Sequence, residues 1–158
     1  MPHVRDLGAA QYRALAELRY QLRRFLTFSE AAARAAGVEP QQHQLLLVLK
    51  ALRPHDRPTV GVVAERLQIQ HNSAVELVQR SVERGFVERR TSHEDRREAS
   101  LRITRAGEGL LRRLSIAHRT ELRSAAPVLV KALNSLVGTT VSARAPRGQQ
   151  EAVGDGTR

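Results

Sequence analysis

The chain has 158 residues, no cysteine and a formal net charge of +10 at pH 7. This length suits one domain with or without an extension and excludes two independent catalytic domains, while the missing cysteine excludes disulfides and thiolate chemistry. With no apolar run near the roughly 20 residues that cross a bilayer and no apolar core of a signal peptide, we expect a cytoplasmic protein without a membrane partner. Its charge alone suits nucleic acid, an anionic surface or acidic proteins.

Residues 7–36 carry apolar side chains at spacings of three and four, which predicts a long amphipathic helix. The apolar stripe is longer than one small domain can cover, so we expect it to pack against other long helices, including those of a second subunit. Gly37 should end this helix. Pro40 should open a second helix that runs to Leu52, where a proline-containing loop, residues 53–58, follows.

Residues 59–67 and 71–84 show two further helical periods, separated by a turn too short for an antiparallel pair. This pattern predicts a helix-turn-helix. Thr59 is expected to cap the first of these helices, and Gly85 to end the second.

Residues 85–91 and 99–103 alternate apolar and polar, with a charged tip at 92–98, which predicts a two-stranded β-ribbon, or wing. Thr104 should cap a further helix, and Pro127 is expected to separate it from a last one. Residues 143–158 are predicted to be a disordered tail. The fold class is mainly α with a small β-wing: a winged helix-turn-helix DNA-binding domain at 37–103, flanked by a helical dimerisation region at 7–36 and 104–138.

The start of a recognition helix points at base edges in the major groove. The candidate DNA-binding residues of this helix are Gln70, His71, Asn72, Ser73 and Glu76, with Arg80 further along it. The amide of Asn72 could pair with adenine, and the ring of His71 could donate a hydrogen bond to guanine or to a phosphate. Glu76 could accept from cytosine or buttress Arg80, and Ser73 could contact a phosphate or cap the helix. The interior residues of this helix are expected to be Val75, Leu77 and Val78.

The wing ends in Asp95, Arg96 and Arg97, which are candidates for DNA contact because a narrow minor groove attracts a guanidinium. The alternative is a solvated hairpin tip. Arg89 and Arg90 alternate across the strand, so at most one of them should face the phosphates.

The tip Asp95-Arg96-Arg97, followed by Leu101-Arg102-Ile103-Thr104 and Gly107, resembles the Asp-x-Arg and Leu-Thr-x-x-Gly signature of MarR-family transcriptional regulators. Residues 80–87 resemble the end of that family's recognition helix, and the likeness covers roughly residues 10–138. The resemblance implies a nucleoid-associated homodimer that represses transcription by binding a pseudo-palindromic operator in double-stranded DNA, with release by a small aromatic or phenolic ligand. It also implies that Asp95 orients Arg97 in the minor groove and that residues 71–76 read bases.

The resemblance further places an effector pocket where the first two helices and the helix after the wing meet the winged core. The residues that could line it are Tyr20, Arg23, His43 and Leu47. The alternatives are an intersubunit ion pair or solvent for Arg23 and a satisfied interior group for His43. The family's redox-sensing members use a cysteine, which this chain lacks.

The six histidines have no metal-binding spacing, and no catalytic motif is present, so we expect no metal, no cofactor and no enzyme activity. Two alternatives stay open from the residues alone. One is a winged-helix module that binds proteins, or DNA without sequence preference, and responds to no effector. The other is an enzyme that acts on nucleic acid.

Overall fold

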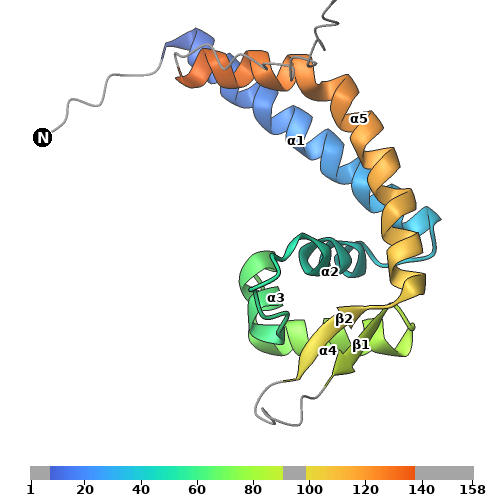
Figure 1. Cartoon of the computed structure of the whole chain (residues 1–158). Helices are drawn as coiled ribbons and strands as arrows, with labels where there is room; N and C mark the ends of the chain where they lie inside the picture. Colours follow the sequence, from blue (N-terminus) through green and yellow to red (C-terminus); the bar gives the residue numbers. More distant parts are fainter. Residues whose placement is uncertain (1–7, 91–98, 138–158) are drawn as a thin grey trace, which may run out of the picture.

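The computed structural model describes residues 8–90 and 99–137 (Figure 1). In chain order, the elements are α1 (Ala9–Ala35), α2 (Pro40–Ala51), α3 (Val60–Leu67), α4 (His71–Glu83), β1 (Val87–Arg90), β2 (Ser100–Ile103) and α5 (Arg105–Val137). The elements from α2 to β2 form a winged core, and the long helices α1 and α5 lie side by side and extend away from it. The mainly helical class with a small β-wing is as predicted.

Local signals in the sequence set most of the helix ends. Gly37 and Gly85 have φ of +74° and +70°, left-handed conformations that glycine adopts without strain after α1 and α4. The Thr59 hydroxyl accepts from the Val62 amide at 3.3 Å. The Thr104 hydroxyl accepts from the Gly107 amide at 3.2 Å and donates to the Gly85 carbonyl at 2.6 Å. Both threonines therefore cap helices, as predicted.

The expected break at Pro127 is wrong, because α5 is a single helix with Pro127 inside it. A proline removes one helical N–H and collides with the preceding turn, which bends or breaks a helix. Figure 1 shows α5 changing direction in its C-terminal part without ending. The packing of α1 along α5 offsets the loss of the hydrogen bond.

The core lies where α2, α3 and α4 meet the wing and the start of α5. Its fully buried side chains include Leu45, Leu46, Leu77, Val63 and Val78. The antiparallel strands pair Val87 with Ile103 and Arg89 with Leu101, and Val87 and Leu101 close the core from the wing side. A Cβ atom at Gly107 would lie 2.3 Å from the Phe86 carbonyl oxygen, so only glycine lets α5 start this close to the wing.

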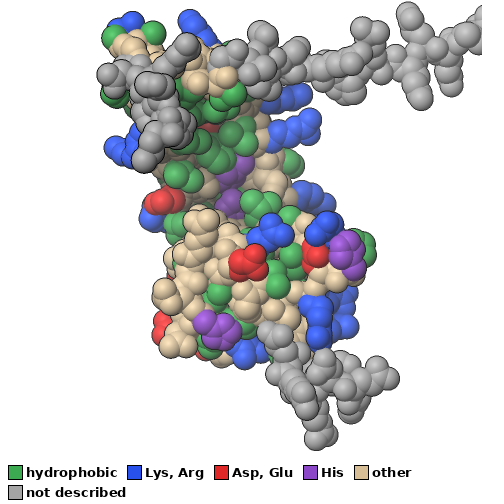
Figure 2. Space-filling model, turned by 90° about the vertical axis from the view of Figure 1, so that its left-hand side faces the viewer, with side chains coloured by type: hydrophobic (Ala, Val, Ile, Leu, Met, Phe, Trp, Pro, Cys, Tyr) green, Lys and Arg blue, Asp and Glu red, His purple; other side chains and the backbone are tan. Residues whose placement is uncertain are grey.

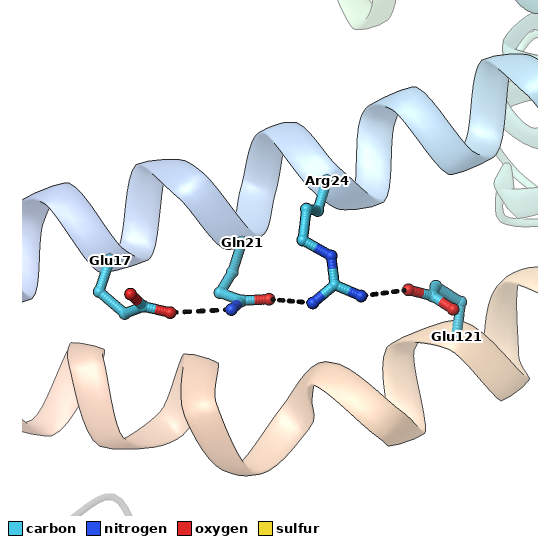
Figure 3. A network of polar contacts seen from close by, with 4 residues as sticks. All are labelled: Glu17, Gln21, Arg24 and Glu121. Atoms are coloured by element: carbon cyan, nitrogen blue, oxygen red, sulfur yellow. Dashed lines mark hydrogen bonds and ion pairs between the residues drawn. The ribbon is translucent and has the colours of Figure 1, made fainter.

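Polar contacts join the long helices further from the core (Figure 3). Gln21 of α1 donates to Glu17 at 2.8 Å and accepts from Arg24 at 3.5 Å, and Arg24 reaches Glu121 of α5 at 3.5 Å. Large apolar side chains on these helices are exposed instead of buried; they include Tyr12, Tyr20, Leu22, Leu26, Ile116 and Leu133. Within residues 8–90 and 99–137, no helix has the length and apolarity needed to cross a membrane.

Candidate nucleic-acid interface

Helix α4 has one face in the core and one face in solvent. Ala74, Leu77, Val78 and Ser81 are buried at helical spacing, and the Ser81 hydroxyl donates to the Leu77 carbonyl at 2.8 Å. The candidate base-reading side chains His71, Asn72, Ser73 and Glu76 are all exposed on the other face. Because the core fixes the buried face, the exposed row has a defined orientation.

Two expectations about α4 are wrong. The residue before the helix is Gln70, so Ser73 lies inside the first turn and is not the N-cap. Val75 is 37% exposed and not interior, because it lies one position off the stripe that α4 buries. Within the described residues no side chain caps the start of α4, and no acidic residue lies in its first turn. The unpaired amides and the helix dipole there favour an anion such as a phosphate.

The C-terminal half of α4 is fixed to the α1–α2 turn. The guanidinium of Arg80 pairs with the Glu39 carboxylate at 3.3 Å. Arg84 donates to the Gly37 carbonyl at 2.5 Å and lies 5.4 Å from the centroid of the Phe86 ring. Glu39 therefore takes the role toward Arg80 that the sequence suggested for Glu76. Glu39 is distant in the chain, and no local pattern indicates this pair.

The described part of the wing brings three arginines into solvent: Arg89, Arg90 and Arg102. Arg90 pairs with Glu88 at 2.9 Å, and Arg102 on the opposite strand lies 3.8 Å from the same carboxylate. Arg89 is exposed and lies across from Leu101. The tip residues Asp95, Arg96 and Arg97 lie outside the described residues, so their contacts with DNA stay predictions. Figure 2 shows Lys and Arg side chains along the edges of both the winged core and the long helices.

The four candidate effector residues do not converge on one site. Tyr20 and Arg23 line a groove of about 500 Å³ between α1 and α5, together with Phe28 and Glu121. His43 and Leu47 line a different groove of about 480 Å³, which is mostly apolar. The remaining residues around the second groove are Phe25, Ser115, His118, Arg119, Leu122, Arg123 and Ala126.

The second groove contains a histidine that the sequence reasoning missed. His118 follows Leu111 and Leu114 on the buried face of α5, so its spacing could have indicated an interior position. Its ring stacks on that of His43. Burial lowers the pKa of His43, and the neighbouring His118 lowers it further. In the described part of the chain, no group of three or more His, Asp or Glu could hold a metal ion.

An exposed helix start beside a two-stranded wing, with a short turn before the helix, defines the winged helix-turn-helix class of DNA-binding proteins. Comparison with known families agrees: residues 36–98 match the model of the MarR family. Comparison of the sequence with curated proteins found no match.

Solved structures of MarR-family regulators share the fold. One titled MarR family transcription regulator SP03579 is 20% identical, with a TM-score of 0.65 over 80% of this chain and 82% of that one. The S. aureus MepR–DNA complex is 14% identical, with a TM-score of 0.64 over 84% of this chain and 93% of that one. AbsC from Streptomyces coelicolor is 18% identical, with a TM-score of 0.63 over 85% and 97% of the two chains.

The chain shares the winged helix-turn-helix fold of solved MarR-family transcription regulators, and its match to that family's model is confined to residues 36–98.

Proposed function

We propose that the protein is a homodimeric, sequence-specific DNA-binding repressor. The observation that carries this proposal is the exposed row His71, Asn72, Ser73 and Glu76 on a helix whose other face is fixed in the core. A helix in this position can enter a major groove while the wing reaches the adjacent minor groove. The fold match to a MepR–DNA complex supports the same geometry.

The long helices support a dimer. Their buried residues far from the core are small or polar, such as Ala14, Gln21, Ala125 and Ala132, whereas Tyr12, Leu22 and Leu133 are exposed. Apolar surface on two long helices that the chain itself leaves uncovered suits a two-fold interface. Residues 7–36 and 104–138 are therefore proposed as the dimerisation region. Two recognition helices about 34 Å apart would then match a pseudo-palindromic operator.

DNA selection tests this function. Duplexes selected from a random pool by the protein should share a pseudo-palindrome, and fluorescence anisotropy should give at least ~1000-fold tighter binding to this duplex than to its shuffled version. Sedimentation without DNA should give twice 17.6 kDa. Equal affinity for the two duplexes would favour the nonspecific module instead, and a monomer at micromolar concentration would contradict the dimer.

We also propose that a small aromatic or phenolic acid releases the protein from DNA. The groove around His43 and Leu47 offers apolar walls, with Arg119 and Arg123 beside it for a carboxylate. Tyr20 and Arg23 line a second groove. The ligand must bind the conformation that cannot bind the operator more tightly than the one that can, because equal affinity shifts no equilibrium.

A thermal-shift screen of phenolic and benzoic compounds should separate the grooves. A ligand in the groove of His43 should lose its stabilising effect in His43→Ala and keep it in Arg23→Ala, and the reverse result would place it in the groove of Tyr20. Operator release is followed in parallel by anisotropy. A compound that stabilises both variants as much as the wild type would remove both residues from the site.

A further inference from the structure

The histidine junction, defined here as His43, His118 and Ser29, joins three helices. The rings of His43 in α2 and His118 in α5 lie 4.7 Å apart between centroids, with 36° between their planes. Both side chains are buried, with exposed fractions of 4% and 8%. Phe25 and Phe28 of α1 present their rings edge to face to His118 at 5.8 and 5.6 Å. The junction thus connects the winged core, through α2, to both long helices.

The hydrogen bond to Leu114 fixes the tautomer of a neutral His118 ring. One ring nitrogen, Nδ1, lies 2.5 Å from the Leu114 carbonyl oxygen, which can only accept, so Nδ1 carries the proton. The other nitrogen, Nε2, lies 2.7 Å from the Ser29 hydroxyl oxygen and in this tautomer accepts a hydrogen bond from the hydroxyl. A second proton at Nε2 would reverse the bond to Ser29 and place a positive charge against the His43 ring.

No free carboxylate is available among the described residues of these helices to balance a charged imidazole. Each acidic side chain of α1, α2 and α5, and the N-cap of α2, already has a partner: Glu17 with Gln21, Glu30 with Arg34, Glu121 with Arg24, Glu108 with Lys50, and Glu39 with Arg80. The charged side chains that line the same groove are Arg119 and Arg123, and both are positive. A proton on the His43 ring therefore enters a buried, positively charged environment.

Protonation and folding oppose each other at this junction. Burial lowers the pKa of His43 from its ordinary 6.5, with His118 as the second cause. Below about pH 6.5 the unfolded chain binds a proton that the folded chain resists. The stability that His43 contributes is therefore complete above this pH and falls as the pH drops toward the lowered pKa of the folded state.

The junction is connected to the recognition helix. The His43 amide donates to the Glu39 carbonyl at 3.1 Å, one helical turn away. The Glu39 carboxylate pairs with Arg80 of α4, and Arg84, the residue that follows α4, donates to the Gly37 carbonyl just before α2. A shift of α2 at His43 therefore displaces two anchors of α4. This chain of contacts is contiguous from the long helices to the C-terminal end of α4.

We propose that the histidine junction is a proton-sensitive connection between the long helices and the winged core, and that acid loosens it and weakens DNA binding. The expected effect of acid on DNA affinity rests on the proposed DNA-binding function. The expected effect of acid on the stability of the fold does not. The two effects are accordingly measured separately.

The first measurement is thermal unfolding by circular dichroism between about pH 8 and about pH 5. It compares wild type with His43→Gln, which keeps a polar side chain but cannot titrate, and with His118→Gln as a second variant should the first fail to fold. The control is His55→Gln, because the His55 side chain is 71% exposed in the loop before α3. On acidification, the melting temperature of wild type and His55→Gln should fall by roughly 3–5 °C more than that of the junction variant.

The second measurement is anisotropy with the selected operator duplex over the same pH range. Protonation of the exposed His71 would strengthen DNA binding in acid, which is the opposite direction. Because wild type and His43→Gln share every other histidine, the difference between their profiles reports on the junction. Wild type and His55→Gln should lose about five- to tenfold more affinity on acidification than His43→Gln.

The outcomes separate this inference from the proposed function. Identical pH profiles of melting temperature and affinity in all variants would overturn the proposal that the histidine junction is proton-sensitive. A difference in melting temperature without a difference in affinity would overturn its connection to DNA binding. If wild type bound no duplex at about pH 8, the proposed function would fail, and the unfolding series alone would decide whether the junction senses protons.

Discussion

The winged core and the pair of long helices are both built from amphipathic helices, but they complete their cores differently. In the winged core, leucines and valines of α2, α3 and α4 are fully buried by one another and by the wing. Along α1 and α5, away from this core, alanines are buried between the helices while leucines and tyrosines are exposed. The same helical pattern therefore predicts burial in both regions, but only in the core does the chain itself supply the partner.

The largest expected effect on stability comes from a substitution at the point where the winged core meets the long helix α5. Gly107→Ala places a Cβ atom 2.3 Å from the Phe86 carbonyl and 2.9 Å from the Ile103 side chain, so the start of α5 must move off the wing. We expect a loss of about 3 kcal/mol in the free energy of unfolding, measured by urea denaturation.

Gly109→Ala is the matched control for Gly107→Ala. It lies in the same helix with open space around the added methyl, and should gain roughly 0.5–1 kcal/mol. Equal effects of the two substitutions would show that the close approach at Gly107 does not determine stability.

The second prediction tests whether a partner covers the long helices. Leu133 is 42% exposed on α5, and Leu133→Glu should weaken dimerisation by about 2–3 kcal/mol, because the interface would have to bury an unpaired carboxylate. Sedimentation equilibrium measures the shift toward monomer. The control Val75→Glu alters an apolar side chain of similar exposure on α4 and should leave the dimer intact; a dimer unaffected by Leu133→Glu would move the interface elsewhere.

The third prediction concerns the exposed face of the core. Asn72→Ala should reduce the preference for the selected operator over single-base variants by about 1–3 kcal/mol, with little change in nonspecific affinity, because base contacts specify while phosphate contacts supply the salt-dependent term. Arg89→Ala should instead weaken binding to all duplexes and lower the salt dependence by about one phosphate contact. Unchanged preferences in Asn72→Ala would assign the base reading to other residues.

The prediction with the smallest expected effect compares two half-exposed ion pairs, one in the winged core and one on the long helix α1. Glu39→Gln removes the partner of Arg80, and Glu30→Gln removes that of Arg34 on α1. Each should cost less than about 1 kcal/mol of stability, because exposed pairs contribute little. Only Glu39→Gln should change operator affinity, since it releases an anchor of α4. Equal affinities of the two variants would show that the Glu39 anchor does not influence the recognition helix.

Much of the fold could be predicted because its signals are local. Thr59 and Thr104 as caps, Gly37 and Gly85 as helix ends, and the alternation of the wing strands each depend on a few neighbouring residues. The exposure of the candidate base-reading residues His71, Asn72, Ser73 and Glu76 also follows from periodicity. The expectation for Val75 was wrong because an apolar residue one position off the stripe turns out of the core.

The sequence by itself determined the order of elements up to β2, the ends of the helices before it and most of the face of α4 that meets solvent, because backbone conformation and hydrophobic period act over a few residues. Tertiary structure alone decided that α5 continues through Pro127, that Glu39 and not Glu76 holds Arg80, and that Tyr20 and His43 lie in separate grooves. It also brought His118 against His43 and Ser29. These contacts join residues far apart in the chain, and their geometry depends on how whole helices pack, which no local pattern encodes.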